Sequence, residues 1–342
     1  MNQKRSLFYF CLLLGMISFR GFAQDIHFSQ FSIAPWQINP AQTGLFQGNY
    51  RFALQHRQQY KTVPVPYMTT SAAGDFQRPF KKHMGVLWTG GIIINNDQAG
   101  DAHYRQTQIL PSLGIIKKMG SDSVDFISFA FRPGWIFTGV DPGLMTFESQ
   151  YNGEGFDPGL STGENFSTSR FSAPDFSLGL AWNHFVNERN QFNLGISLMN
   201  FIKPRDGYLQ GKNQWRSRRI NLQTGIIRSL NSKLDLLPEM MIQFQNKYLE
   251  AVPGVRLRYW IPDGKGSFYG IYAGLHYRLR DAILLSAQMD YGPWRGGVSY
   301  DITMSSLKAA NNRRGGFEVH LIYLLKKLSL PKSDRKICPV YL

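Results

Sequence analysis

The sequence predicts an all-β fold, namely a transmembrane antiparallel β-barrel of the outer-membrane type with about 14 strands. Segments that alternate apolar and polar residues recur along the chain, and each is about as long as a tilted strand that crosses a bilayer. The connections between these segments also sort into short and long ones. In the segment from Ser267 to Arg280, Ile271 and Leu275 belong to an apolar register, whereas the opposite register ends in Arg278 and Arg280. Because strand side chains alternate between two faces, this segment has an apolar face and a polar face.

The N-terminus is predicted to be a secretory signal peptide over residues 1–23. Lys4 and Arg5 precede an apolar core over 7–19, and the small residues around Ala23 form a cleavage site. After cleavage, Cys338 would be the only cysteine, so no intramolecular disulfide is expected.

The mature chain is expected to divide into a leader or plug over 24–48, a barrel over 49–327 and a C-terminal tail over 328–342. The leader contains proline steps that oppose helix and strand, yet it carries the apolar residues Phe28 and Trp36. Since exposed apolar loop residues usually pack against something, we expect the leader to lie inside or beneath the barrel. It is either a plug that only stabilises the barrel or part of a docking surface for a partner.

The expected strands share the alternating pattern and are bounded by turn residues. They cover residues 50–57, 67–76, 83–94, 103–117, 124–136, 172–186, 191–201, 219–229, 234–244, 250–260, 267–279, 282–290, 294–303 and 317–326. Short, turn-like connections follow the even-numbered segments, whereas the long connections 137–171, 202–218 and 304–316 follow odd-numbered ones. Short periplasmic turns and longer external loops are typical of outer-membrane barrels. A soluble β-sandwich or propeller is the alternative, although no blade repeat is visible.

A barrel of this size encloses a hole, which is either a pore or plugged. Glycine normally weakens a strand, so we expect the glycines inside these segments at curved walls or at close contacts in the lumen. They are Gly179, Gly195, Gly225, Gly254, Gly270 and Gly274. Arginines on the polar faces are expected to point into the lumen, where they have a role or are merely solvated. They are Arg51, Arg57, Arg219, Arg256, Arg258, Arg278 and Arg280.

The chain is strongly basic, with a formal net charge of +15, which becomes +12 when Lys4, Arg5 and Arg20 leave with the signal peptide. On an exported barrel, this charge favours contact with phosphates of outer-membrane lipid or with an acidic partner. No nucleic-acid binding is expected, because the chain lacks a zinc pattern, a recognition helix and a lysine-rich arm.

No motif predicts an enzyme, a cofactor site or a metal site. GxSxG and P-loop motifs are absent from the sequence, and the seven histidines have no metal-binding spacing. Residues Asn96 to Asp101 carry two carboxylates but lack the oxygen spacing of a calcium loop. A turn with Gly100 at a special dihedral angle is expected there instead.

An ordered series of short motifs spans nearly the whole chain. It consists of HFSQF at 27–31, NPAQTG at 39–44, RQQY at 57–60, NDQAGD at 96–101, SYD at 299–301, GFEV at 316–319 and ICP at 337–339. This series resembles the PorP/SprF family of type IX secretion system membrane proteins. The end of the chain departs from the pattern, because Val340-Tyr341-Leu342 stands in place of a phenylalanine-ended tail.

The resemblance implies a barrel in the outer membrane of Bacteroidetes-type Gram-negative bacteria that works with other type IX secretion components. It implies that the protein binds and helps export or anchor a large secreted, adhesin-like surface protein through the C-terminal domain of that partner, often in gliding motility. A passive porin with a basic lumen and an outer-membrane hydrolase at the barrel rim are the alternatives. The candidate partner-binding residues are His27, Phe28, Phe31, Trp36, Asn39, Asn96, Asp97, Arg256, Arg258 and Arg278.

Overall fold

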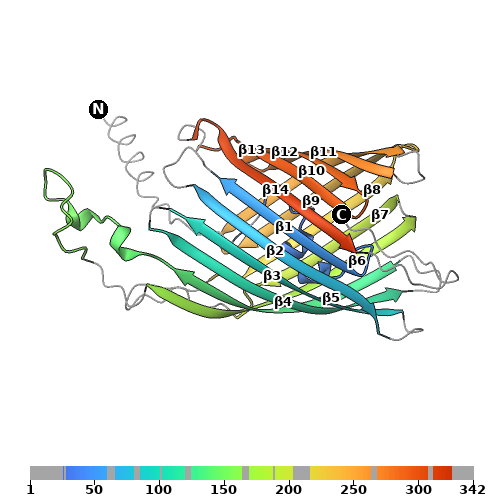
Figure 1. Cartoon of the computed structure of the whole chain (residues 1–342), viewed down its shortest axis with the longest axis horizontal. Coiled ribbons are helices and arrows are strands. Elements are labelled where there is room, and N and C mark those ends of the chain that lie inside the picture. The colour runs from blue at the N-terminus through green and yellow to red at the C-terminus, as the bar shows by residue number, and fades with distance from the viewer. Residues whose placement is uncertain are drawn as a thin grey trace, which may run out of the picture.

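Fourteen antiparallel strands close into one barrel in the computed structural model, where each strand pairs with its neighbours in sequence and β1 pairs with β14 (Figure 1). The described residues are 26, 28–59, 66–80, 85–100, 102–119, 125–163, 169–187, 189–202, 216–262, 268–306 and 311–325. The strands are β1 (Tyr50–Gln59), β2 (Tyr67–Pro79), β3 (Val86–Ala99), β4 (Tyr104–Met119), β5 (Asp125–Gly139), β6 (Arg170–Asn187), β7 (Asn190–Met199), β8 (Arg219–Ser229), β9 (Leu234–Gln245), β10 (Tyr248–Pro262), β11 (Phe268–Arg278), β12 (Ala282–Tyr291), β13 (Trp294–Thr303) and β14 (Arg314–Leu325). The predicted fold class and strand number are confirmed.

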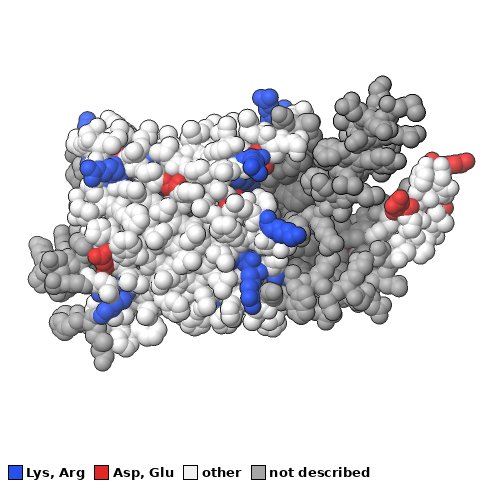
Figure 2. Space-filling view, turned by 180° about the vertical axis from the view of Figure 1, so that it is seen from behind, with Lys and Arg blue, Asp and Glu red and all other residues white. Residues whose placement is uncertain are grey.

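The strands carry an apolar face outward and a polar face inward. On β1, the outward Leu54 is 58% exposed, whereas the inward Arg51 is 1% exposed. Figure 2 shows that the middle of the outer wall carries few charged side chains. An apolar band of this kind is what a lipid bilayer requires of a barrel wall.

The two ends of the barrel differ in their connections. One end has short turns, such as 230–233 between β8 and β9 and 292–293 between β12 and β13, and it also holds the start of β1 and the end of β14. The long β5–β6 connection, 140–169, leaves from the opposite end. Since outer-membrane barrels keep short turns in the periplasm, the first end is periplasmic and the second external.

Aromatic pairs mark the periplasmic end of the wall. The rings of Phe80 and Trp88 are 5.5 Å apart, and those of Trp294 and Tyr323 are 4.6 Å apart. Such a girdle is typical of the interface between lipid tails and headgroups.

The N-terminal segment runs through the lumen from the external to the periplasmic end (Figure 1). The carbonyl of Ile26 accepts a hydrogen bond from Arg219 at the external end of β8, and the amide of Asn49 donates to Leu325 at the periplasmic end of β14. Between them lie α2 (Pro35–Ile38) and the 3-10 helix η1 (Pro40–Gln42). Two further 3-10 helices, η2 (Pro142–Leu144) and η3 (Glu148–Gln150), belong to the β5–β6 connection. Among the described residues, no helix has the length and apolar character needed to cross a membrane.

Candidate functional site: the occupied lumen

Residues 28–48, called the plug from here on, lie inside the barrel and bond to its wall. Their backbone is mostly irregular, so its N–H and C=O groups need partners outside regular secondary structure. Wall side chains supply them: Arg132 donates to the carbonyl of Trp36 at 2.5 Å, and Asn221 donates to the carbonyl of Ile38 at 2.8 Å. On the periplasmic side, Gln77 donates to the carbonyl of Phe46 at 2.6 Å. The polar lumen therefore takes the place of the missing strand or helix partners.

The apolar plug residues pack on apolar patches that interrupt the polar wall. One patch holds Ile33, Ala34 and Trp36 of the plug with Ala53, Ile93, Leu110 and Ile322 of the wall. Another holds Phe31 and Ile38 of the plug with Met241 and Val252. A third packs Leu45 against Ile116, Phe126 and Phe185. Burial of these side chains stabilises the plug in place, at about 1.5–3 kcal/mol for each large residue.

Arg51 joins the plug to the wall through its guanidinium group. It bonds to Asp75 at 2.9 and 2.6 Å and donates to the carbonyl of Gln42 at 3.2 Å. The same group lies 4.0 Å from the ring centroid of Trp36 and 4.6 Å from that of Phe46. Because it is both ion-paired and stacked on two aromatic rings, Arg51 holds both halves of the plug.

Two glycines of the wall, Gly179 and Gly195, leave the space that the start of η1 occupies; this space is called the glycine seat from here on. Asn39 caps this helix by accepting from the amide of Ala41 at 2.9 Å, and it donates to the carbonyl of Leu180 at 3.2 Å. A Cβ atom at Gly179 would overlap Asn39 and lie 2.7 Å from the nitrogen of Ala41, and one at Gly195 would lie 2.8 Å from Asn39. The expectation of close contacts at these two glycines is confirmed, since only a wall without side chains admits the plug here.

A buried ionic cluster holds the plug near the external end. The amide of Ser29 donates to Glu318 at 2.5 Å, and its hydroxyl donates to Asp301 at 2.5 Å. Arg278 donates to the Ser29 hydroxyl at 2.8 Å, and Arg57 lies 3.2 Å from Asp301 and 3.4 Å from Glu318. Buried charges are tolerated when they are paired and hydrogen-bonded, as they are here.

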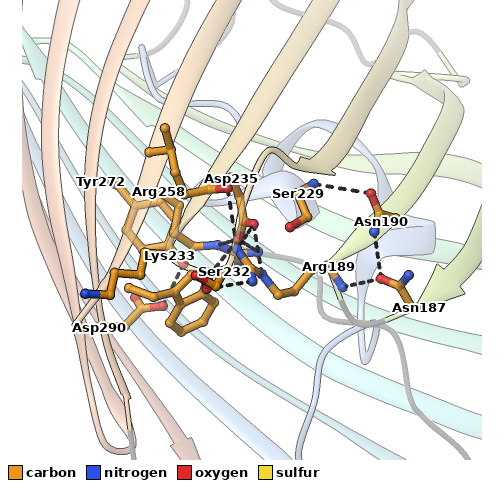
Figure 3. A network of polar contacts seen from close by, with 12 residues as sticks. Asn187, Arg189, Asn190, Ser229, Ser232, Lys233, Asp235, Arg258, Tyr272 and Asp290 are labelled. Carbon is orange, nitrogen blue, oxygen red and sulfur yellow. Dashed lines mark hydrogen bonds and ion pairs between the residues drawn. The ribbon is translucent and has the colours of Figure 1, made fainter. Parts of the chain in front are cut away.

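A second network pairs the lumen arginines of the periplasmic half (Figure 3). Asp235, fully buried, accepts from Arg258 at 2.8 Å, from Trp260 at 2.7 Å and from Arg189 at 2.9 Å. Asp290 pairs with Arg295 and accepts from the hydroxyl of Tyr272 at 2.8 Å. The arginines on this side of the lumen are thus neutralised by carboxylates on neighbouring strands.

Residues 21–323 match the family model described as the type IX secretion system membrane protein PorP/SprF. The chain belongs to this family. Membership and the outer-membrane type of barrel give the protein a secretion-related role in the outer membrane, as a secretion or transport component with other type IX components as partners.

Solved structures with a similar fold are other outer-membrane barrels. The CymD monoaromatic hydrocarbon channel has a TM-score of 0.50 and 8% identity, over 90% of this chain and 96% of CymD. The Ralstonia pickettii toluene transporter TbuX has a TM-score of 0.49 and 11% identity, over 84% and 92%. The Pseudomonas putida toluene transporter TodX has a TM-score of 0.48 and 9% identity, over 88% and 93%. The likeness at these identities is one of fold alone. The comparison with curated proteins gives no significant match.

Several motifs that characterise the PorP/SprF resemblance meet in the lumen although they are far apart in sequence. Ser29 comes from HFSQF, Asp301 from SYD and Glu318 from GFEV, and all three belong to the external ionic cluster. Asn39 of NPAQTG occupies the glycine seat. The motifs therefore share a structural task, which is to fix the plug to the wall.

Four candidate residues of the N-terminal segment are described and buried, but they face different parts of the wall. Phe28, Phe31, Trp36 and Asn39 are at most 6% exposed. His27 lies outside the described residues. Ser29, Asp301 and Glu318 are not among the candidates predicted from the sequence, although their places inside HFSQF, SYD and GFEV were an available signal.

The candidate residues of the wall do not form one patch. Arg256 pairs with Glu239 at 2.7 Å and, with Phe31, lines a small cavity in the lumen. Asp97 faces inward and accepts from Thr69 at 2.5 Å, whereas the neighbouring Asn96 is exposed on the outer face. Arg258 and Arg278 belong to the periplasmic network and the external cluster, respectively.

One expected lumen arginine is placed elsewhere. β11 ends at Arg278, and Arg280 lies in the following turn with φ of 61° and an exposed side chain. The prediction that Arg280 points into the lumen is wrong, because the alternation of faces stops where the strand stops. The other six arginines are buried, each at most 5% exposed.

The segment 96–101 behaves as a strand end followed by a turn. β3 extends to Ala99, and Gly100 adopts the left-handed φ of 67° expected for the turn. Across the residues that the structure describes, no group of three or more His, Cys, Asp or Glu side chains is arranged to hold a metal ion.

Proposed function

We propose that this protein captures a large secreted surface protein at the external end of the barrel and helps to export or anchor it. The partner would be bound through its C-terminal domain, as the family resemblance implies. Membership of the type IX secretion family supports a role in secretion, and the long external connections offer the surface for capture.

The observation that carries this proposal is the plug. It runs the height of the lumen and bonds to β2, β5, β8 and β14, among other strands. The interior of the barrel is therefore occupied by the protein's own N-terminal segment. A partner is therefore held at the mouth and the external connections rather than passed through the barrel. β-Strand addition to an exposed edge in these connections is a suitable mode for a β-rich domain.

The plug also argues against a passive porin. A porin for anionic solutes needs open space and unpaired cationic groups, but the lumen arginines Arg57, Arg256 and Arg258 each face a carboxylate. We expect the purified protein to be silent in planar bilayers at low voltage. Steady, anion-selective conductance of the unmodified protein would instead favour the porin.

Affinity purification from native outer membranes tests capture directly. The full chain with a C-terminal tag should co-elute with one large secreted protein, and truncation of the C-terminal domain of that protein should abolish co-elution. Co-elution that survives this truncation, or the absence of a secreted protein, would contradict the proposal. A tagged outer-membrane porin from the same cells controls for membrane carry-over.

A further inference from the structure

The β5–β6 connection carries a separate structured unit outside the barrel. Residues 140–163, called the arm from here on, extend beyond the external ends of β5 and β6 and away from the wall (Figures 1 and 2). The arm contains η2, η3 and an isolated antiparallel bridge between Tyr151 and Phe156. It is thus the most prominent described feature at this end of the molecule.

The arm orders itself through its own hydrogen bonds. Gln150, 5% exposed, is at its centre: its side chain accepts from the amide of Phe147 at 3.1 Å and its carbonyl accepts from the amide of Asp157 at 2.8 Å. The hydroxyl of Ser149 donates to the carbonyl of Thr162 at 2.6 Å. A unit of this kind presents fixed side chains to a partner, which lowers the entropic cost of binding.

The charge of the arm opposes that of the rest of the chain. From 140 to 163 the sequence contains four acidic residues and neither lysine nor arginine, although the whole chain has a net charge of +15. Glu148 and Glu154 are exposed, and neither side chain takes part in an ion pair among the described residues. The acidic side chains on the arm are visible at the right of Figure 2.

Apolar side chains lie among these carboxylates. Tyr151 is 59% exposed and Phe156 is 52% exposed, and Leu144 and Leu160 are also exposed. Exposed aromatic residues are typical of protein interfaces. A lipid surface does not fit this combination, because its phosphates would repel the carboxylates. A protein face that combines positive charge with apolar side chains fits both the carboxylates and the exposed apolar residues of the arm.

We propose that the arm docks a cationic, apolar face of a partner protein. The inference rests on the proposed capture of a secreted protein at the external end, and it adds the chemistry of the face that is captured. Its physical basis is charge complementarity over a preordered apolar surface.

Binding of a defined probe tests the arm without the native partner. The full chain in nanodiscs of zwitterionic lipid is titrated into a fluorescein-labelled peptide that alternates lysine with valine and tyrosine, and anisotropy is recorded. We expect saturable binding that weakens as salt rises, since exposed charge contacts are screened. A peptide with glutamate in place of each lysine should not bind. Failure of the lysine peptide to bind the unmodified chain would overturn the proposal.

Matched variants assign the binding to the arm. Glu148→Gln combined with Glu154→Gln should weaken the lysine peptide about fivefold, as expected for two exposed charge contacts. Tyr151→Ser combined with Phe156→Ser should weaken it as well. Asp125→Asn removes a partly exposed carboxylate at the periplasmic end and should leave binding unchanged. Equal binding by all variants would refute docking at the arm.

Co-purification distinguishes the two proposals. If the lysine peptide binds the arm but no secreted protein co-elutes from native membranes, the proposed function fails and the binding preference of the arm holds. If a secreted protein co-elutes equally with the unmodified chain and with the Glu148→Gln/Glu154→Gln variant, capture holds and the arm proposal fails.

Discussion

The plug and the arm are not part of the barrel strands, and both are rich in aromatic residues and turn residues. The plug is enclosed by the barrel, whereas the arm is exposed at the external end. In the plug, Trp36 is 4% exposed and its carbonyl is bonded by Arg132 of β5. In the arm, Tyr151 is 59% exposed, and the side chain of its neighbour Gln150 bonds to Phe147 and Leu160 of the arm itself. What differs is where the side-chain partners of the backbone come from: wall residues such as Arg132 and Asn221 bond to the backbone of the plug, whereas the bonds that order the arm lie mostly within the arm.

This contrast predicts how each region responds to substitution. Changes at contacts between the plug and the wall should lower the stability of the whole protein, because buried groups lose their partners. Changes on the arm should leave the free energy of unfolding unchanged and alter binding. Urea unfolding in detergent micelles, followed by tryptophan fluorescence, measures the first effect.

The largest effect is expected for Arg51→Met. The substitution leaves Asp75, whose side chain is 10% exposed, without its arginine and removes the stacking on Trp36 and Phe46. Loss of one partner of a buried ion pair costs about 3–5 kcal/mol, and the free energy of unfolding should fall by that amount. The double variant Arg51→Met/Asp75→Asn should recover part of the loss; if it is no more stable than the single variant, the pair is not coupled.

Ser29→Ala should have the next largest effect. It removes the hydroxyl that Arg278 and Asp301 share, but it retains the backbone bond to Glu318. A hydrogen bond to a charged group contributes about 1.5–3 kcal/mol. We expect a loss of stability in this range and faster proteolysis within the plug. Unchanged stability would show that the external cluster does not hold the plug.

Gly179→Ala should destabilise the protein by about 1–3 kcal/mol, because the new methyl group overlaps the seat of Asn39. Gly296→Ala is the matched control in another strand, where the nearest atom to an added Cβ is 3.7 Å away. Limited proteolysis should cut the plug faster in the first variant and not in the second. Similar behaviour of the two variants would mean that the seat is not specific to the plug.

The smallest effect is expected for Glu148→Gln combined with Glu154→Gln. Substitutions of exposed residues away from specific contacts stay within about 0.5 kcal/mol. Unfolding should therefore match that of the unmodified chain while binding of the lysine peptide weakens. A clear loss of stability would show that the carboxylates support the fold of the arm.

Much of the wall could be predicted from the sequence because its signal is local. The outward Leu54 and the inward Arg51 follow from alternation alone, and the sorting of short and long connections distinguished the two ends. Strand ends were less predictable, as Arg280 shows: the alternating pattern continues past Arg278, but the hydrogen-bonded ladder does not.

The sequence by itself determined about fourteen membrane-length strands with an apolar outer face, because a period of two and a segment length are properties of each strand alone. Only the tertiary structure decided that Ser29 meets Glu318, 289 residues away, and that Gly179 makes room for Asn39. Those contacts depend on ring closure between β1 and β14 and on strand register. Both arise from the whole set of pairings, which no single segment contains.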